Sequence, residues 1–514
     1  MVEKTMMLGK PVTAVWEITM GCNMRCKHCG SGCSTALPGQ LSTEEALKVC
    51  DELGAMGLQW VTISGGEPTT RDDWPLIAAR LHKNGVIPNM ITNGWLFDEG
   101  ILELAIHAGV GTIAFSVDGL KETHDFIRRE GSFVRIMQAM ELCRSREIDV
   151  KAITTINKMN LGELKELKKQ LVLRGVKGWQ VQMGFPMGNM ANHSGMVIEP
   201  GDIDTVIDLA YQCMVESSIE VILGDCLGYF NLKEIELFKK RCGGTYSRQG
   251  CTAGKYTFGI LHNGDILGCT SIRDKEFIEG NIRQTPLKDI WENPNHFSWN
   301  RNMKKESLAG FCQKCRFGDR CLGGCSNSKL TIGGSVYAEN QYCSYNYANK
   351  KRIKQYEHIK TEDLIAMARK FAAKGYCQLA ETALFVVLQR AGTESNVNLL
   401  NLYGYVSFRL GNYHVALKAN DKVLQLEPNE VYALKGKGLC LSRLGSPEEG
   451  IALLRKAVSL TDENFMDPYL DLAIVLSENG HQEEAISVIE QGRQRSQQFV
   501  AQSQKLYQQL KGLG

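Results

Sequence analysis

The chain has 514 residues, too many for one ordinary domain, so its length predicts two to four domains. Its 59 basic and 57 acidic residues leave a formal net charge of +2, which argues against nucleic acid or an anionic membrane as a partner. The sequence shows neither the apolar core of a signal peptide nor an apolar run long enough to cross a bilayer. We therefore expect a soluble, cytoplasmic protein that binds neither nucleic acid nor membranes.

Three cysteines follow the first predicted strand, residues 14–20. Cys22, Cys26 and Cys29 lie within eight residues of sequence. A cubane 4Fe-4S cluster takes four ligands, so three thiolates leave one iron open to a small molecule. A zinc site is the alternative, and it would need His28 or Cys33 as the fourth ligand. In a reducing compartment, metal ligation is a better interpretation of the 18 cysteines than disulfides.

Strand-like and helix-like segments alternate from residue 14 to about residue 215. The expected strands are residues 14–20, 60–65, 87–92, 112–117, 149–156 and 178–183. Helical patterns such as residues 43–56 and 161–174 separate them. Six such units predict a parallel sheet whose right-handed crossovers curl it into an open or partial barrel. Active sites of α/β folds lie at the carboxyl ends of such strands.

Several strand ends carry glycine and short polar residues. The second strand ends in a Gly-Gly-Glu-Pro segment, residues 65–68, whose glycines let a ligand approach the backbone. The third strand ends in Thr92 and Asn93, and the fourth ends near Ser116 and Asp118. Short polar side chains after a buried strand either contact a ligand such as a ribose or cap the next helix or turn.

Glycine and cysteine become frequent in residues 221–358, while periodic apolar residues become scarce. Such a segment does not readily bury a core of its own, and metal clusters would supply the missing cohesion. Seven of its cysteines form a spaced series: Cys251, Cys269, Cys312, Cys315, Cys321, Cys325 and Cys343. The alternative is a pair of zinc sites built on the four cysteines from 312 to 325.

The last segment, residues 359–514, is helical and repetitive. Gly375, Gly411, Gly445 and Gly480 recur at steps of 36, 34 and 35 residues. Each lies five residues before a small residue, namely Ala380, Ala416, Gly450 and Ala485. This period predicts stacked helix pairs closed by a final helix near residues 494–511, with a generic helical bundle as the alternative.

Together these motifs resemble the radical S-adenosylmethionine (radical SAM) enzymes that carry a SPASM domain. The resemblance rests on the Cys-x3-Cys-x2-Cys loop, on the Gly-Gly-Glu strand end and on the seven-cysteine series. The C-terminal repeats resemble tetratricopeptide repeats (TPR). The resemblance implies a partial (β/α)6 radical SAM barrel at residues 1–220, a SPASM domain at 221–358, and an all-α TPR solenoid with a capping helix at 359–514.

In this family the open iron binds SAM, and one electron releases a 5'-deoxyadenosyl radical that abstracts hydrogen. By resemblance, Cys22, Cys26 and Cys29 hold the SAM-binding 4Fe-4S cluster. The expected SAM-binding residues are His28, Gly65, Gly66, Glu67, Pro68, Thr92, Asn93, Ser116, Asp118, Arg128 and Gln182. No catalytic acid or base is assigned, because proton transfers depend on how the substrate lies.

The SPASM resemblance implies two auxiliary 4Fe-4S clusters. One is expected on Cys312, Cys315, Cys321 and Cys343, and the other on Cys251, Cys269 and Cys325. Two clusters need eight ligands, so the second either keeps an open iron or takes a further thiolate. Cys242 is the first candidate for that eighth ligand and Cys226 is the fallback.

The resemblance predicts a maturase that modifies a ribosomally synthesised peptide by crosslinking, thioether formation or oxidation. The alternatives are a protein maturase that forms formylglycine in a sulfatase or a quinone precursor, and a non-enzymatic iron-sulfur carrier or scaffold. Sulfatase-maturing relatives commonly carry Asp where this chain has Thr270, which disfavours that alternative. Expected partners are a peptide or protein recruited by the TPR region, a flavodoxin- or ferredoxin-like reductant and, unless the repeats replace it, a separate leader-binding protein.

Overall fold

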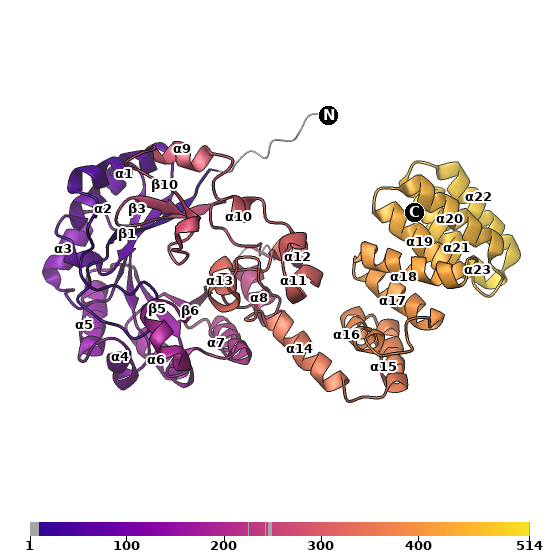
Figure 1. The fold of residues 1–514 in the computed structure, drawn as a ribbon, viewed down its shortest axis with the longest axis horizontal. Coiled ribbons are helices and arrows are strands. Elements are labelled where there is room, and N and C mark those ends of the chain that lie inside the picture. The colour runs from indigo at the N-terminus through magenta and orange to yellow at the C-terminus, as the bar shows by residue number, and fades with distance from the viewer. Residues whose placement is uncertain (1–9, 225, 242, 245–248, 513–514) are drawn as a thin grey trace. The chain divides into compact units, whose positions relative to one another are not determined.

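The computed structural model describes residues 10–224, 226–241, 243–244 and 249–512. Figure 1 shows these residues as a ribbon. They divide into two compact units, one that ends at Tyr347 and one that begins at Ala348. The ranges of the three domains expected from the sequence stay a prediction. Every helix in the described ranges is too short or too polar to span a membrane.

One sheet organises the N-terminal unit, and the six predicted strands form its centre. They are β1 (Thr13–Thr19), β2 (Trp60–Gly65), β3 (Ile87–Thr92), β4 (Thr112–Ser116), β5 (Val150–Ile156) and β6 (Gly178–Met183). These strands pair in chain order, and each pair is parallel. The predicted parallel order is confirmed.

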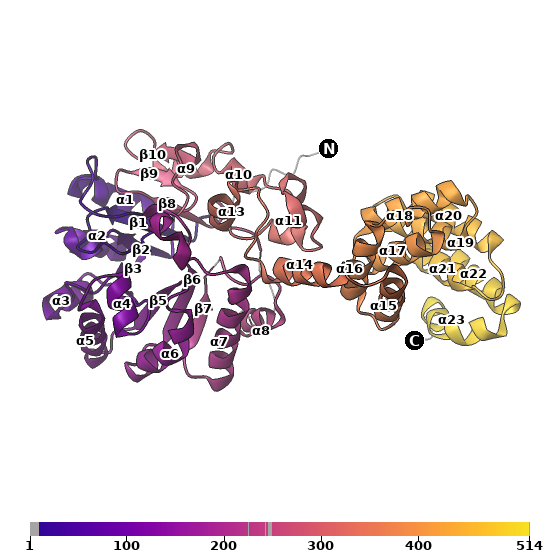
Figure 2. The ribbon, with the colours of Figure 1, turned by 60° about the horizontal axis from the view of Figure 1, so that its bottom comes forward.

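The sheet is wider than the six expected units. β7 (Glu220–Leu223) pairs parallel with β6, and β8 (Thr257–Ile260) pairs parallel with β1. β9 (Asp265–Leu267) and β10 (Ile278–Asn281) extend the β8 edge as antiparallel strands. The full strand order is β10-β9-β8-β1-β2-β3-β4-β5-β6-β7 (Figure 2). The segment expected at residues 221–358, called the cysteine-rich segment below, therefore contributes strands directly to the barrel sheet.

Helices cover the outer face of this sheet (Figure 1). They are α1 (Thr43–Ala55), α2 (Trp74–Lys83), α3 (Glu99–His107), α4 (Lys121–Ile127), α5 (Ser132–Ser145), α6 (Leu164–Leu173) and α7 (Ile203–Glu216). A capping box starts α1, because Ser42 Oγ accepts from the Glu45 N–H and the Glu45 carboxylate accepts from the Ser42 N–H.

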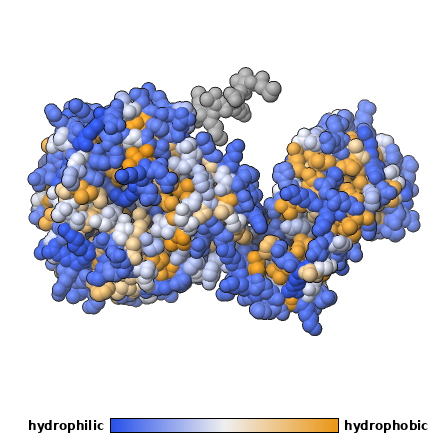
Figure 3. Space-filling model, viewed as in Figure 1, coloured by the Kyte–Doolittle hydropathy of each residue, from blue (hydrophilic) through white to orange (hydrophobic). Residues whose placement is uncertain are grey.

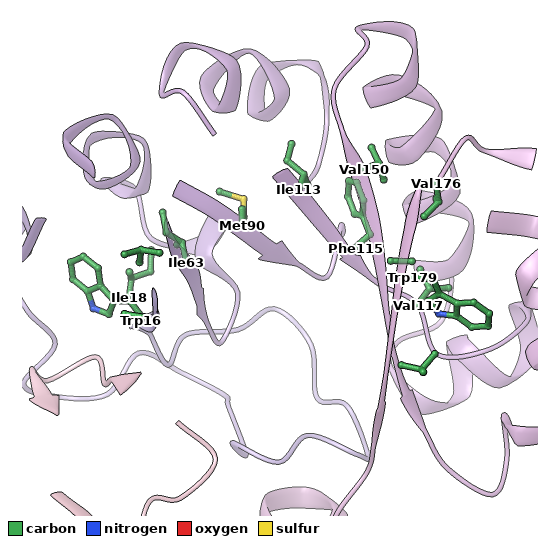
Figure 4. Packing of buried hydrophobic residues seen from close by; sticks show 14 of the residues in the cluster. Trp16, Ile18, Ile63, Met90, Ile113, Phe115, Val117, Val150, Val176 and Trp179 are labelled. Atoms are coloured by element: carbon green, nitrogen blue, oxygen red, sulfur yellow. The ribbon is translucent and has the colours of Figure 1, made fainter. Parts of the chain in front are cut away.

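Alternating side chains separate the core from the barrel interior. Trp16, Ile63, Phe115 and Trp179 belong to the large apolar core that the sheet buries against its helices (Figure 4). Successive residues of a strand point to opposite faces. Glu17, between Trp16 and Ile18 of β1, therefore faces the other way. The interior of the barrel consequently receives polar side chains at the strand ends.

The cysteine-rich segment contains short helices and small apolar clusters. Its helices are α8 (Leu232–Arg241), α9 (Leu287–Glu292), α10 (Ser298–Arg301), α11 (Gly310–Lys314), α12 (Gly318–Cys321) and α13 (Ser326–Gly333). Cys321 and Cys343 lie in one small cluster, Cys269 packs against a second and Cys312 lies in a third. α14 (Ser344–Tyr356) then leads into the C-terminal unit.

The C-terminal unit consists of antiparallel helix pairs and a last helix. The helices are α15 (Thr361–Ala373), α16 (Cys377–Leu388), α17 (Val397–Arg409), α18 (Tyr413–Leu426), α19 (Val431–Arg443), α20 (Pro447–Leu460), α21 (Asp467–Glu478), α22 (Gln482–Arg495) and α23 (Gln497–Leu510). The helical region is confirmed, and its assignment to the TPR class stays a prediction.

The repeated glycines lie where the first helix of each pair ends. Gly375, Gly411, Gly445 and Gly480 all have φ between 78° and 92°, a left-handed conformation that favours glycine. The small residues that follow them lie in the second helices. At Gly450, an added Cβ would lie 2.5 Å from the Gly438 carbonyl oxygen, so α19 and α20 approach too closely for a side chain.

Candidate iron-sulfur and SAM site

Two glycines bring the end of β2 against the start of the cysteine loop, which follows β1 and contains Cys22, Cys26, Cys29 and Cys33. The Gly66 N–H donates to the Thr19 carbonyl at 2.7 Å, and the Glu67 N–H donates to the Gly21 carbonyl at 2.8 Å. A Cβ at position 65 would lie 2.2 Å from the Thr19 oxygen, and one at position 66 would lie 2.0 Å from the Gly21 oxygen. The Gly-Gly-Glu segment therefore borders the loop that carries Cys22, Cys26 and Cys29.

Nitrogen donors surround two of the loop sulfurs. The Met24 N–H lies 3.5 Å from Cys22 Sγ, and Asn93 Nδ2 lies 3.8 Å from the same sulfur. Arg128 Nη1 lies 3.9 Å from Cys26 Sγ. Burial raises the pKa of Cys26 to about 11, although the Arg128 charge opposes this shift. Donors of this kind stabilise thiolates and tune iron-sulfur clusters.

Cys33 is a fourth cysteine of the loop, and it contacts the third. A hydrogen bond from the Cys33 thiol lowers the pKa of Cys29 below its ordinary value, against the opposing effect of burial. The Cys33 sulfur also lies 3.6 Å from the Gly65 carbonyl oxygen, to which its thiol can donate. Cys29 is thus the loop cysteine most easily converted to the thiolate that binds iron.

A buried ionic group lies directly beside the cysteine loop. Asp118 Oδ2 lies 2.7 Å from His28 Nε2 and 2.5 Å from Arg128 Nε, and its Oδ1 accepts from the Thr155 N–H at 2.7 Å. Burial alone would raise the pKa of Asp118, but the Arg128 and His28 charges outweigh it and hold that pKa well below its usual range. Asp118 therefore positions His28 and Arg128.

His28 retains a free ring nitrogen inside this group. Its Nδ1 is buried and has no hydrogen-bond partner in the part of the chain that the structure describes. A buried polar atom without a partner is unfavourable unless a ligand or water satisfies it. This orphaned nitrogen, three adjacent thiols and a glycine-lined backbone edge fit a SAM-binding cluster.

The Glu67 carboxylate holds the end of β3. Its Oε1 accepts from Thr92 Oγ1 at 2.7 Å, and its Oε2 accepts from the Asn93 N–H at 2.7 Å. Burial raises the pKa of Glu67, although the Asn93 N–H and the threonine hydroxyls oppose this shift. Pro68 begins a short 3-10 helix, Pro68–Thr70, behind Glu67. The segment thus positions Asn93 near Cys22.

The remaining predicted SAM contacts lie on β4 and β6. Ser116 is the last residue of β4 and is half-buried. Gln182 on β6 donates to Thr155 Oγ1 at 3.3 Å and accepts from Gln180 Nε2 at 3.2 Å. Thr155 also provides the N–H bound by Asp118. Gln182 is therefore connected to the ionic group through Thr155.

A second ionic group lies near the loop, and no sequence pattern predicted it. Arg273 Nη1 donates to Glu17 Oε2 at 2.9 Å, and its Nη2 donates to Ser31 Oγ at 2.6 Å. Glu17 is only 4% exposed. Arg273 and Glu17 lie 256 residues apart in sequence, too far for any local pattern to pair them. The contact joins β1, the cysteine loop and the cysteine-rich segment.

His124 was also missed. Its Nδ1 accepts from the Asp118 N–H at 3.1 Å. Burial, followed by the Arg128 charge, lowers the pKa of His124 to about 3. His124 is therefore neutral near pH 7 and supports Asp118 without adding charge. A histidine on a predicted helix is ordinarily a surface residue, so the sequence offered no signal for it.

Four downstream cysteines form the first auxiliary group: Cys312, Cys315, Cys321 and Cys343. Backbone N–H groups of Asn340, Phe317 and Asn346 lie 3.4 Å from the sulfurs of Cys312, Cys315 and Cys343, respectively. Burial raises the pKa of Cys343 well above its usual value, and the other three thiolates raise it further. The structure thus brings together the four cysteines predicted to share a cluster.

The second auxiliary group surrounds a cavity of about 510 Å³. Cys251, Cys269 and Cys325 line it together with small residues such as Ala253 and Gly324. A cavity bordered by three thiols fits an iron-sulfur cluster. The structure therefore also brings together the three cysteines predicted for the second cluster.

A fourth cysteine accompanies this group. Burial raises the pKa of Cys325. The charge of the nearby Cys226 thiolate raises this pKa further, and its effect is larger than that of the Cys251 or Cys269 thiolate. Cys226 is buried in the barrel core, against which Cys325 packs, and its sulfur lies 3.4 Å from the Met183 N–H. Cys242, the first candidate from the sequence, lies outside the described residues.

Comparisons with known proteins agree with this geometry. The model of the radical SAM superfamily matches residues 16–171, and the SPASM model, an iron-sulfur cluster-binding domain, matches residues 251–316. An AdoMet-dependent heme synthase of Methanosarcina barkeri is 31% identical over 67% of this chain and 99% of its own length. The mycofactocin maturase MftC of Mycobacterium ulcerans is 28% identical over 66% of this chain and 89% of its own length.

Solved structures show the same fold. SuiB of Streptococcus suis bound to S-adenosylmethionine has a TM-score of 0.52 at 17% identity, and the match covers 65% of this chain and 77% of SuiB. The structure of anSMEcpe with bound AdoMet also has a TM-score of 0.52 at 17% identity, with 65% and 94% covered. The chain belongs to the radical SAM superfamily, and it is a radical SAM enzyme with a SPASM domain that uses SAM and 4Fe-4S clusters.

Proposed function

We propose that this radical SAM enzyme is a maturase that modifies a ribosomally synthesised peptide through hydrogen abstraction. The observation that carries the proposal is the helical unit that begins at Ala348. The match to the heme synthase covers 99% of that relative but only 67% of this chain, so about a third of the chain has no counterpart there. Concave helical repeats bind extended or helical peptides. The similarity to a mycofactocin maturase supports the same substrate class.

The helical unit carries a packed group of aromatic and charged side chains. Tyr432 of α19 stacks on Phe465 at 5.8 Å between ring centroids, and Lys435 Nζ lies 4.9 Å and 5.4 Å from these two rings. Lys435 also pairs with Asp471 at 3.2 Å and Asp467 at 3.4 Å. Figure 3 shows hydrophobic residues gathered on the visible face of this unit. Such a surface, held on the same chain as the barrel, would raise the local concentration of a bound peptide.

Within the barrel, we assign the cluster ligands to Cys22, Cys26 and Cys29. The bound cluster and SAM supply a hydrogen-abstracting radical. The chain's own residues hold and orient them. Gly65 and Gly66 let the end of β2 pack directly against the backbone of the loop at Thr19 and Gly21, and Asn93 donates toward Cys22. The supporting hydrogen bonds among Glu67, Thr92 and Asn93 are formed within the chain itself.

The ionic group beside the loop provides the remaining SAM contacts. Asp118 fixes Arg128 and His28, Arg128 extends toward Cys26, and the free Nδ1 of His28 is available to a ligand. An arginine held in one orientation suits the carboxylate of SAM. Ser116 and Gln182 complete the polar lining from β4 and β6.

For the auxiliary clusters, we assign one to Cys312, Cys315, Cys321 and Cys343, and the other to Cys251, Cys269, Cys325 and Cys226. Cys226 replaces Cys242 as the preferred eighth ligand because of its place beside Cys325. A cluster ligated by four cysteines has no iron open to substrate. Its role would be to accept the electron that remains when the substrate radical becomes product. Thiolate-ligated clusters of this kind suit a reducing, cytoplasmic compartment.

A tetrapyrrole is the second candidate substrate. The observation that favours it is the 31% identity to a heme synthase over nearly that enzyme's whole length. A formylglycine-forming maturase is less well supported, because the cavity beside Cys269 is lined by Thr270 where an aspartate base would be expected.

The test is a direct comparison of the two substrate classes. Anaerobically reconstituted enzyme is mixed with SAM, a reductant and either peptides encoded beside this gene or iron coproporphyrin III. We expect 5'-deoxyadenosine together with a peptide of shifted mass. Conversion of the tetrapyrrole, with every peptide unchanged, would overturn the proposal.

A further inference from the structure

A group of cations lies on the outer side of the cysteine loop. We call Arg25, Lys27, Arg129 and Arg135, with the aromatic residues Trp95 and Phe126, the basic patch. The Arg25 guanidinium donates to the Cys22 carbonyl at 2.7 Å and to the Met24 carbonyl at 2.8 Å. Arg129 donates to the Asn23 carbonyl at 2.8 Å. The patch is therefore attached to the backbone of the loop that holds the SAM cluster.

Aromatic rings fix the positions of these cations. The Arg129 and Arg135 guanidinium carbons lie 3.6 Å and 4.2 Å from the centroid of the Trp95 ring. Lys27 Nζ lies 4.1 Å from the Phe126 ring centroid, and Phe126 is 53% exposed. Cation–π contacts of this kind restrain otherwise mobile side chains. The patch is consequently organised before any partner binds.

The charge of the basic patch is uncompensated. Across the described ranges, none of its four cations forms an ion pair with a carboxylate, and the neighbouring Glu122 and Glu130 pair with none of them. Arg25, Arg129 and Arg135 are exposed. The whole chain carries a net charge of only +2, so this concentration of positive charge is local. Such a surface steers acidic partners toward it.

A short connection leads from the basic patch to a cluster ligand. Asn93 Oδ1 accepts from the Trp95 N–H at 2.9 Å, and Asn93 Nδ2 lies 3.8 Å from Cys22 Sγ. One side chain therefore separates the backbone of Trp95 from a sulfur of the cluster loop. Electron transfer weakens steeply with distance, so this is a favourable place for an electron to enter.

We propose that the basic patch is the docking surface for an acidic, flavodoxin-like electron donor. The proposal rests on the radical SAM activity, which needs one electron per SAM cleaved. The donor's reduced flavin loses one electron and the enzyme gains it, and no bond forms between the proteins. Transient electron-transfer complexes have small interfaces that are guided by charge. An acidic donor therefore fits a patch of three exposed arginines and a half-buried lysine, none of which pairs with a carboxylate in the described ranges, better than it fits the barrel interior.

The experiment uses the fully loaded enzyme and a purified acidic flavodoxin. The variants are Arg129→Glu/Arg135→Glu and the single Arg135→Glu, which touches no atom of the cysteine loop. Lys48→Glu, an exposed residue of α1, is the matched charge control. Stopped-flow absorbance follows the oxidation of the reduced flavin at low and high salt. The affinity for oxidised flavodoxin is measured separately, as a readout independent of turnover.

We expect the double variant to slow flavin oxidation at low salt by about 10-fold or more, with a smaller salt dependence and weaker flavodoxin binding. Arg135→Glu has a smaller effect in the same direction, and Lys48→Glu has none. SAM cleavage driven by dithionite is unchanged in all variants. An unchanged flavodoxin rate in both patch variants would overturn the proposal. An equal loss of dithionite-driven SAM cleavage in the patch variants would also overturn the proposal, because the patch would then act by altering the cysteine loop. A parent enzyme that does not cleave SAM with dithionite would instead contradict the radical SAM activity itself.

Discussion

The barrel and the cysteine-rich segment of the N-terminal unit are stabilised in different ways. The barrel strands bury one large apolar core that includes Trp16, Phe115 and Trp179 (Figure 4). Part of the cysteine-rich segment, including Phe258, Trp291 and Phe297, packs in this same core, whereas residues 303–343 are built mainly on small clusters around Cys312, Cys321 and Cys343. Small cores stabilise a fold poorly, and bound metal contributes folding free energy directly. The barrel and the strands paired with it are therefore expected to fold without iron, and residues 303–343 to depend on it.

The ionisable groups of the two regions also differ in what satisfies them: other residues of the chain in the barrel, and bound metal in the cysteine-rich segment. In the barrel, the Asp118 charge is balanced by the Arg128 guanidinium of the same chain. In the cysteine-rich segment, burial raises the pKa of Cys325 and Cys343, so both stay protonated until metal displaces the protons. One site is preorganised by protein groups, whereas the other is completed by its clusters.

The largest effect is expected from replacing Cys22, Cys26 and Cys29 together with alanine. SAM cleavage should be abolished because the cluster that binds SAM loses all its protein ligands. The barrel should remain folded, since its core does not involve these side chains. Chromatography of 5'-deoxyadenosine and circular dichroism measure the two outcomes. Residual SAM cleavage in this variant would contradict the assignment of the site.

Removal of all iron should separate the two regions. Anaerobic chelation is expected to leave the amides of β1 to β6 protected from hydrogen exchange, while residues 303–343 exchange much faster. Hydrogen-exchange mass spectrometry of the loaded and stripped protein measures both. Equal protection of the cysteine-rich segment in the two forms would show that its own packing suffices.

Asp118→Asn tests the preorganised group. The change leaves the buried Arg128 without its counter-charge, which costs about 3–5 kcal/mol in the free energy of unfolding. Because the pKa of Asp118 is depressed in the fold, its stabilisation is present above its unfolded pKa of about 3.9 and is lost as pH falls through the lower folded value. Denaturant titrations of the iron-free protein at pH 7 measure the loss, and equal stability of parent and variant would refute the role of Asp118.

Cys226→Ala has a narrower expected effect. Iron content should fall by at most one cluster, and the spectrum of the second auxiliary cluster should change, because one of its four thiolates is removed. Cys213→Ala, which alters a buried cysteine of α7, serves as the control. Iron analysis and Mössbauer spectra measure the difference. Identical spectra for the parent and the Cys226 variant would show that Cys226 is not a ligand of that cluster, which would then have three protein ligands.

Local patterns explain which features the sequence could predict. The six central strands, the loop with Cys22, Cys26 and Cys29, and the glycines that end the C-terminal helices each depend on residues close in sequence, whereas the grouping of the seven downstream cysteines came from the family resemblance. The pairing of β8 with β1, which sets Thr13 opposite Thr257, depends on the return of a distant segment to the barrel. The contact between Arg273 and Glu17 likewise forms only because this distant segment packs against β1.

The choice between Cys226 and Cys242 shows the same limit. Spacing identified the seven SPASM cysteines, but it does not say which upstream loop reaches Cys325. The role of Asp118 was also only partly accessible from sequence, because a polar residue after a strand can contact a ligand or hold other residues. The three groups that bind its carboxylate, from His28, Arg128 and Thr155, lie 90, 10 and 37 residues away in sequence.

Isotope transfer tests the central claim most directly. The loaded enzyme is given SAM, reductant and perdeuterated peptides encoded beside its gene, and the 5'-deoxyadenosine formed is analysed by mass spectrometry. Hydrogen abstraction from a peptide predicts 5'-deoxyadenosine that carries deuterium, together with a peptide of altered mass. Unlabelled 5'-deoxyadenosine with every peptide unchanged would contradict a peptide substrate.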